Sequence, residues 1–180
     1  MIVRQCVFST SRLLVKEWHS FTSENMGGRV LPDVVAAMLT PPVTRQLPTG
    51  WQGAYTRERA QQWIADRDAE GVTLLVVERA GGNPVGLVIL FEFGDAAAQK
   101  IELRLGYLLS EESWGRGLAS ELLEGFVGWC RTNAISSVEG GVERGNDASR
   151  RVLEKNGFLP VSDQGGDESE EQVFRLQLRP

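Results

Sequence analysis

Residues 103–119, LRLGYLLSEESWGRGLA, constrain the fold more than any other part of this 180-residue chain. An apolar, strand-like run leads into a short acidic loop, and two closely spaced glycines, Gly115 and Gly117, then open an amphipathic segment. The first N–H groups of a helix have no partner within the helix, and the helix dipole adds partial positive charge there. The pattern therefore predicts a helix N-terminus that binds the phosphate of a cofactor.

Composition and charge limit the class of protein. A length of 180 residues fits one domain, residues 1–180, with a core of ordinary size. The net charge of −5 and a pI near 5.0 argue against binding to nucleic acid, which needs many basic contacts. The longest apolar run, residues 85–91, is too short to span a bilayer, and no signal-type apolar segment opens the chain. We expect a cytoplasmic protein that binds neither nucleic acid nor membrane.

The two cysteines, Cys6 and Cys130, give no sign of covalent chemistry. Cys130 falls on the apolar side of the helix expected after the glycines, where a free cysteine behaves as a small hydrophobic residue. No disulfide is expected. A nucleophilic site built from a cysteine and His19, the one histidine, has no supporting spacing.

Strand-like and helix-like runs follow one another in a mixed order. Continuous or alternating apolar runs predict strands, and apolar residues three or four positions apart predict helices. Strands are predicted over residues 12–17, 72–78, 85–93, 101–109, 137–142, 159–162 and 172–178. Helices are predicted over residues 33–39, 57–68 and 148–156, and from Leu118 onward. Thr56 and either Asn146 or Asp147 are the predicted N-caps.

Glycines and prolines mark where the predicted elements end. Pro41 and Pro42 are expected to stop the first helix, before a loop over residues 45–53. Gly71 and Gly157 are expected to end their helices, the latter with a left-handed cap closed by the apolar residue beyond it.

The connections indicate the order of the sheet. Residues 81–84 and 94–99 are short links, so the strands that they join are expected to be antiparallel neighbours. The helix after Gly117 provides one parallel crossover, and the chain is assigned to the α+β class. Gly125 and Gly128 lie inside that helix, where each costs about 1 kcal/mol relative to alanine. They indicate a close approach to a neighbouring segment.

Several linked motifs resemble the GCN5-related N-acetyltransferases, the GNAT superfamily. Trp114–Ala119, WGRGLA, matches the family's cofactor signature except at its first position, where most members have Gln or Arg. Tryptophan at this position resembles the branch of ribosomal-protein N-terminal acetyltransferases, in which an aromatic residue commonly stands there. Asn146–Ser149 and Leu153–Phe158 resemble the family's second cofactor motif, and Thr10–Val15 resembles the opening strand of that branch. The resemblance spans nearly the whole chain.

The resemblance implies a fold and a cofactor. The fold is a mixed, mostly antiparallel central sheet with flanking helices, whose strands splay apart at the cofactor site. Acetyl-coenzyme A would donate its acetyl group, with its pyrophosphate on the backbone N–H groups of residues 116–120 and its pantetheine arm along residues 101–109. The cofactor-binding residues implied are Leu108, Leu109, Trp114, Gly115, Arg116, Gly117, Leu118, Ala119, Ser120, Asn146 and Ser149. As alternatives, Asn146 only caps its helix, and Ser149 caps it or faces water.

The resemblance implies acid–base catalysis by this chain's own residues, without a metal. Glu102 is the preferred base, acting through water, and an ion pair with Arg104 on the same strand face is the alternative. Glu92 and Glu139 are further candidates. Leu153 stands where the family usually has its tyrosine acid, so Ser149 becomes the candidate acid.

The acceptor is expected to be an amine, of a small molecule or of a protein N-terminus. Trp51 and Tyr55 are candidates for an acceptor pocket, whereas Trp63 is expected in the core. An acidic run between the last two strands would attract a cationic amine, or would simply form a solvated loop; it comprises Asp163, Asp167, Glu168, Glu170 and Glu171. The protein is expected as a monomer or a homodimer.

Two alternative functions compete with acetyl transfer. A dinucleotide-binding oxidoreductase would use Gly115, Gly117 and Ser120 with Glu139, but the glycines do not follow their strand immediately, and too few residues remain for a doubly wound sheet. A non-catalytic module that binds acyl-coenzyme A stays open, because Leu153 replaces the usual acid.

Overall fold

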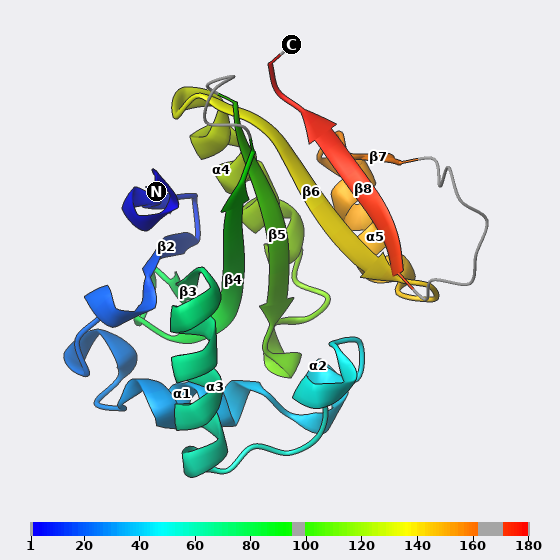
Figure 1. Cartoon of the computed structure of the whole chain (residues 1–180). Coiled ribbons are helices and arrows are strands. Elements are labelled where there is room, and N and C mark those ends of the chain that lie inside the picture. The colour runs from blue at the N-terminus through cyan, green and yellow to red at the C-terminus, as the bar shows by residue number, and fades with distance from the viewer. Residues whose placement is uncertain (1, 95–99, 162–170, 180) are drawn as a thin grey trace.

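A computed structural model describes residues 2–94, 100–161 and 171–179 (Figure 1). Within these residues the centre of the fold is one sheet, with the strand order β1-β2-β3-β4-β5-β6-β8-β7. The pair β5–β6 is parallel and every other neighbouring pair is antiparallel. The predicted α+β class and the mixed, mostly antiparallel sheet are confirmed.

The strands and helices have these bounds. The strands are β1 (Phe8–Ser9), β2 (Leu13–Glu17), β3 (Val72–Glu78), β4 (Pro84–Phe93), β5 (Ile101–Leu109), β6 (Ile135–Glu143), β7 (Leu159–Pro160) and β8 (Glu171–Gln177). The α-helices are α1 (Leu31–Met38), α2 (Pro41–Thr44), α3 (Arg57–Glu70), α4 (Leu118–Thr132) and α5 (Asp147–Lys155). Short 3₁₀ turns are η1 (Ile2–Gln5), η2 (Trp18–Ser20), η3 (Glu24–Met26), η4 (Thr49–Trp51) and η5 (Glu111–Ser113).

Helices cover the two faces of the sheet unequally. Figure 1 shows α4 and α5 behind the sheet, with α1 and α3 in front of its β2–β4 half. The rear layer buries Phe126 and Leu153 with one face of the strands, and the front layer buries Met38 and Trp63 with the other. Both faces of β3 are covered, and its first six residues, 72–77, are all buried. Among the described residues, no helix covers the front face over β5, β6 and β8.

The strands β5 and β6 part at the centre of the molecule. Their parallel pairing begins at Ile101 with Ile135 and ends at Leu105 with Gly140. Residues 106–109 continue to pair with β4 on the other side, from Gly106 with Ile89 to Leu109 with Gly86. Their β6-facing backbone groups therefore have no strand partner. This confirms the expected splay.

Most predicted helix ends are confirmed. The Thr56 side chain accepts a hydrogen bond from the N–H of Arg59 at 3.2 Å and caps α3. Gly157 has a φ of 87°, and the N–H of the fully buried Phe158 returns to the carbonyl of Leu153 at 3.1 Å. This is the predicted left-handed cap with its apolar contact.

The structure adds detail to three of the predictions about helix ends and loops. Pro41 and Pro42 begin α2 rather than only ending the preceding helix, because proline fits the first turn, where an N–H has no partner. The expected loop over residues 45–53 contains the single turn η4. Gly71 ends α3 with an extended φ of −167°, and a Cβ there would lie 2.4 Å from the carbonyl oxygen of Leu90. That glycine is required by the close approach of β4.

The two glycines inside α4 differ. A Cβ on Gly125 would lie 2.6 Å from Cγ2 of Thr10 and 2.9 Å from Cε2 of Phe8, so β1 packs directly on this turn. A Cβ on Gly128 would meet nothing within 4 Å. The predicted close approach is right for Gly125 and wrong for Gly128.

None of the helices in the described part of the chain has the length and apolar character needed to cross a membrane.

Candidate active site

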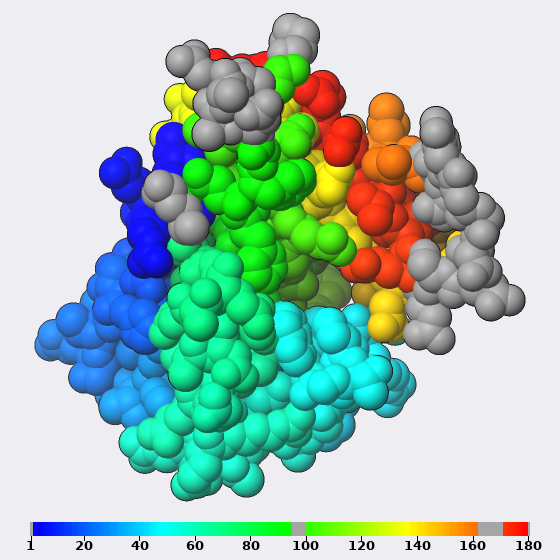
Figure 2. Space-filling model, viewed as in Figure 1, coloured from blue at the N-terminus to red at the C-terminus, as the bar shows by residue number. Residues whose placement is uncertain are grey.

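A cavity of about 950 Å³ occupies the splay between β5 and β6. Its walls come from α2 and the segment after it, the second half of β5, the glycine loop with the start of α4, the end of β6 and the start of α5. Figure 2 shows a hollow on the front face, between the surface of α2 and the surfaces of β6 and β8. Segments far apart in the sequence thus share one cavity.

The glycine loop presents backbone donors to this cavity. Gly115 and Gly117 have left-handed φ angles of 71° and 75°, which residues with a Cβ adopt at a cost. Gly117 is the N-cap of α4, and no side chain caps the helix. The next three residues, 118–120, line the cavity. Because N–H groups of a first helical turn have no partner within the helix, this cradle fits a phosphate group.

Trp114 fixes the start of the loop. Its indole Nε1 donates a hydrogen bond to the carbonyl oxygen of Leu109 at 3.1 Å, while 49% of the residue stays exposed. Leu108 and Leu109 also line the cavity. The end of β5 and the glycine loop are thereby held together, with the unpaired strand edge leading to the cradle.

Asn146 and Ser149 both line the cavity, and Asn146 also caps α5. Oδ1 of Asn146 accepts a hydrogen bond from the N–H of Ser149 at 3.2 Å. The capping alternative for Asn146 is confirmed, and it does not exclude a contact with a ligand, because both residues line the cavity. Leu153, one turn further, is buried and also borders the cavity.

Tyr107 is a site residue that the sequence did not suggest. Its Oη lies 2.8 Å from Oγ of Ser149, and both residues line the cavity. Burial raises the pKa of Tyr107, and the hydrogen bond with Ser149 offsets only part of this effect, so the phenol stays neutral at neutral pH. Its alternation with Leu103 and Leu105 indicated that it faces the core. The partner could not be foreseen, because it lies 42 residues away.

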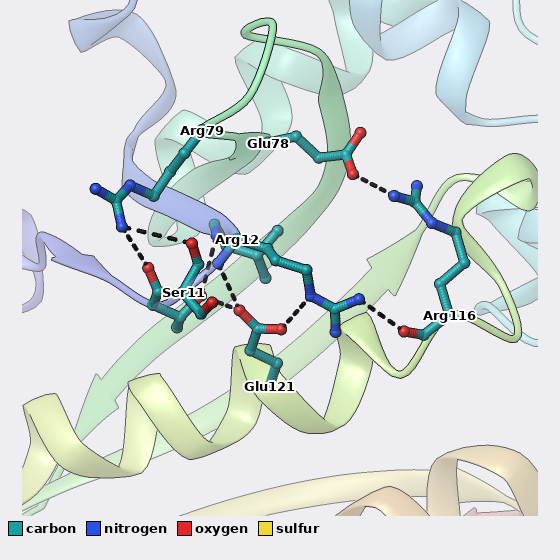
Figure 3. Close-up of polar contacts among 8 residues, drawn as sticks. Ser11, Arg12, Glu78, Arg79, Arg116 and Glu121 are labelled. Atoms are coloured by element: carbon teal, nitrogen blue, oxygen red, sulfur yellow. Dashed lines mark hydrogen bonds and ion pairs between the residues drawn. The ribbon is translucent and has the colours of Figure 1, made fainter.

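The side chain of Arg116 points away from the cavity. Figure 3 shows its guanidinium paired with the carboxylate of Glu78, at the end of β3. Every other residue from 113 to 120 lines the cavity, and Arg116 does not. The resemblance implied Arg116 as a cofactor-binding residue, and the structure gives no support to a contact through its side chain.

Glu102, the predicted base, lies outside the cavity lining. Its Oε1 accepts a hydrogen bond from Oγ of Ser137 at 2.9 Å, near the start of β5. The alternative ion pair with Arg104 is not seen either, because Arg104 pairs with Glu171 at 3.1 Å. A catalytic role for Glu102 finds no geometric support. Glu92 and Glu139 do not line the cavity either.

The predicted aromatic pocket is reduced to one residue. Trp51 lines the cavity and Tyr55 does not. Oη of Tyr55 donates a hydrogen bond to the carbonyl oxygen of Trp51 at 2.9 Å, so Tyr55 supports the wall from behind. Trp63 is buried, as expected, with its ring edge-on to Trp51 at 5.5 Å between centroids.

The open face of the sheet adds a charged wall that the sequence showed only in part. Arg104 alternates with Leu103 and Leu105, which pack toward α4, and therefore faces the front. Glu143 follows the buried Val142 and pairs in register with Glu171, so both carboxylates share that face. With Arg45 after α2, the charged wall consists of Arg45, Arg104, Glu143 and Glu171.

Glu171 is the one member of the predicted acidic run that the structure describes. Its carboxylate rests on the backbone of β6, since a Cβ on Gly141 would lie 1.8 Å from its Oε1. The other four acidic residues of the run, Asp163, Asp167, Glu168 and Glu170, lie outside the described residues.

The cysteines take no part in this site. Cys6 and Cys130 are free and fully buried in the rear core. Burial raises the pKa of Cys6 to about 12 and that of Cys130 as well, so neither forms the thiolate that a nucleophile requires. His19 pairs with Asp68 at 2.8 Å on the surface. The reading as packing residues is confirmed.

A comparison with protein families finds a match over most of the chain. A family model described as an acetyltransferase (GNAT) domain matches residues 30–159. No curated protein sequence matches the chain.

Solved structures share the fold over nearly the whole length. A GNAT-family acetyltransferase from Bacillus anthracis has a TM-score of 0.73 at 15% identity, covering 96% of this chain and 99% of that one. A GCN5-related N-acetyltransferase from Brucella melitensis has a TM-score of 0.72 at 15% identity, covering 96% and 78%. RimL, a ribosomal-protein acetyltransferase solved with coenzyme A, has a TM-score of 0.70 at 14% identity, covering 96% and 98%. At these identities the likeness establishes the fold.

Proposed function

Because the chain belongs to the GNAT acetyltransferase family, we propose that it transfers an acetyl group from acetyl-coenzyme A directly to a primary amine. The observation that carries the proposal is the single cavity that joins an uncapped helix N-terminus, an unpaired strand edge and the Tyr107–Ser149 pair. A phosphate cradle alone would fit many ligands. The unpaired edge beside it suits an extended, amide-containing arm such as pantetheine.

The backbone supplies most of the cofactor site in this proposal. The N–H groups of residues 117–120 would bind the pyrophosphate, and the β6-facing groups of residues 106–109 would hydrogen-bond the pantetheine amides. Trp114 and Asn146 border the same space. When bound, acetyl-coenzyme A supplies an activated thioester, and transfer forms a C–N bond, breaks the C–S bond and moves one proton from amine to sulfur.

Ser149 is the proton donor that the geometry favours. Ser149 lines the cavity, and Tyr107 beside it keeps its proton, since burial raises the pKa of Tyr107. Tyr107 can therefore donate a hydrogen bond to Oγ of Ser149 while the serine hydroxyl points its own proton into the cavity. This pair would occupy the role that a tyrosine at position 153 has in most relatives.

The charged wall is the proposed acceptor site. Glu143 places a carboxylate on the open face of the sheet, where it would attract a cationic amine. Glu171 beside it is paired with Arg104, whereas the side chain of Glu143 makes no hydrogen bond or ion pair with any residue that the structure describes. The RimL relative acts on a ribosomal protein. A protein N-terminus or a small-molecule amine would suit this wall.

A turnover assay tests the proposal. The full chain is incubated with acetyl-coenzyme A and a panel of primary amines, with N-terminal peptides included, and released thiol is measured. We expect turnover with at least one amine, reduced about 10- to 100-fold in Ser149→Ala. Binding of acetyl-coenzyme A without turnover on any amine would instead favour the non-catalytic binding module, which the buried Leu153 keeps as the second candidate.

A further inference from the structure

One side chain, Arg12, connects the turn between β1 and β2 to both parts of the phosphate cradle (Figure 3). Its Nη1 donates a hydrogen bond to the carbonyl oxygen of Arg116 at 3.0 Å, in the glycine loop. Its Nε forms an ion pair with Oε2 of Glu121 at 2.6 Å, in the first turn of α4. Oγ1 of Thr10 and the N–H of Arg12 also donate to Oε1 of Glu121, at 2.5 and 2.8 Å.

The bond to Arg116 fixes the direction of a donor in the cradle. In a trans peptide the C=O and the following N–H point in opposite directions, and no cis peptide occurs among the described residues. With its carbonyl turned to Arg12, the Arg116–Gly117 peptide must turn the N–H of Gly117 to the other side. Gly115 and Gly117 line the cavity, whereas Arg12 and Arg116 do not. The N–H of Gly117 therefore points toward the cavity.

The ion pair with Glu121 removes an unfavourable charge. Glu121 lies in the helical turn whose N–H groups form the cradle, so its carboxylate would repel a phosphate. Burial alone would raise the pKa of Glu121, but hydrogen bonds from Thr10 and Arg12 outweigh it and the pKa falls below its usual value. The carboxylate is thus charged at neutral pH, and the guanidinium of Arg12 neutralises it.

We propose that Arg12 is a positioning residue for the cofactor's diphosphate, which it never needs to touch. It aims the N–H of Gly117 at the diphosphate and cancels the charge of Glu121 beneath it. The inference rests on the proposed function, because it takes the diphosphate of acetyl-coenzyme A as the ligand.

Calorimetric titration of coenzyme A into Arg12→Met tests the role of this side chain. Methionine keeps the length of the aliphatic part and removes both bonds. We expect the Kd to rise about tenfold, since one aimed donor is lost and one charge is uncovered. Arg12→Lys restores the charge but cannot make both bonds, so its Kd should lie between those of the unaltered protein and of Arg12→Met. This variant keeps the test valid if Arg12→Met does not fold.

Arg79→Met is the matched control. Nη1 of Arg79 donates to the carbonyl oxygens of Thr10 and Ser11, at 3.0 and 3.5 Å, and so supports the same turn. In Figure 3 it lies across that turn from Arg116, and its side chain makes no hydrogen bond or ion pair with the described residues of the loop or of α4. Its substitution should lower the melting temperature without changing the Kd for coenzyme A. Equal losses of affinity in the two variants would show that the turn is merely structural and would overturn the proposal.

A second arm separates the diphosphate from the rest of the ligand. Arg12→Met should weaken the binding of coenzyme A and of 3′-dephospho-coenzyme A by the same factor. Pantetheine has no diphosphate, so its affinity, measured by competition, should not change. Weaker binding of pantetheine, or an unchanged Kd for coenzyme A, contradicts the role of Arg12. Absence of coenzyme A binding by the unaltered protein would overturn the proposed function itself, which is a distinguishable result.

Discussion

The two sides of the cavity are built in different ways. The cofactor side, residues 113–120 with Asn146, offers backbone donors whose directions are fixed by left-handed glycines, by a helix terminus and by hydrogen bonds from Arg12. The proposed acceptor side is the charged wall, whose side chains come from the residue after α2 and from β5, β6 and β8. In the proposed function, the fixed backbone binds the cofactor and the side chains of the charged wall bind the acceptor. The comparison predicts that substitutions on each side affect different ligands.

The largest expected effect is on the cofactor side, at Gly117. In Gly117→Val a β-branched residue must adopt a φ of 75°, which costs about 1–3 kcal/mol or forces the loop to change shape. We expect binding of acetyl-coenzyme A to weaken at least about 100-fold in equilibrium dialysis, because several donors move together. The control is Gly128→Ala on the same helix, where a Cβ meets nothing within 4 Å. It should bind normally and gain stability of about 0.5–1 kcal/mol.

A second prediction lies where the two sides meet, at Tyr107. Tyr107→Phe removes the hydroxyl that contacts Oγ of Ser149 and keeps the ring. The kcat should fall about tenfold, because Ser149 loses the hydrogen bond that orients its proton. The Kd for acetyl-coenzyme A should change less than about twofold. A large change in the Kd with an unchanged kcat would assign the pair to binding alone.

A third prediction concerns the acceptor side. Glu143→Gln should raise the KM for the amine several-fold and leave the Kd for acetyl-coenzyme A unchanged, since its carboxylate borders the cavity far from the cradle in sequence. Initial rates over a range of amine concentrations measure the effect, and added salt should shrink it by screening the attraction. Glu102→Gln is the comparison variant, because Glu102 lies outside the cavity lining. A stronger effect at Glu102 would contradict the assignment of the acceptor side.

The smallest expected effect is a dependence of stability on pH at Glu121. The pKa of this group is lowered in the folded state, so its contribution is complete above the unfolded pKa of about 4.3 and is lost as the pH falls through the folded value. Glu121→Gln should therefore cost about 1 kcal/mol at pH 7 and progressively less below about pH 4. Urea denaturation at several pH values measures this difference. An equal cost at all pH values would mean that the carboxylate charge is unimportant.

The sequence predicted the geometry of the glycine loop and of the α5 cap well, because their determinants are local. Gly115 and Gly117 are adjacent to the helix that they open, and Asn146 caps the helix that it precedes, so spacing alone indicates their geometry. The strand pattern over residues 72–109 was predicted almost residue for residue, since its short turns leave few alternatives. Local patterns could not distinguish Gly125, which meets β1, from Gly128, which meets nothing.

The acceptor side depends on pairing between distant strands, which the sequence does not specify. Glu102 has the right residue type on the right strand, but the splay begins only after Leu105, too late to bring it into the cavity. Glu143 enters the site because β6 ends beside α5, and Tyr107 because α5 packs against its face of β5. These contacts follow from strand register and from helix packing. Neither can be inferred from the residue types and spacing that suggest candidate acids and bases.

Calorimetric titration of the full chain with acetyl-coenzyme A, with NADH as the control ligand, shows directly whether the cavity is a coenzyme A site. We expect binding of one acetyl-coenzyme A per chain and no binding of NADH, because the cradle is joined to a strand edge that suits pantetheine. Absence of acetyl-coenzyme A binding, or binding of NADH in its place, would contradict the assignment of this cavity to an acetyltransferase cofactor.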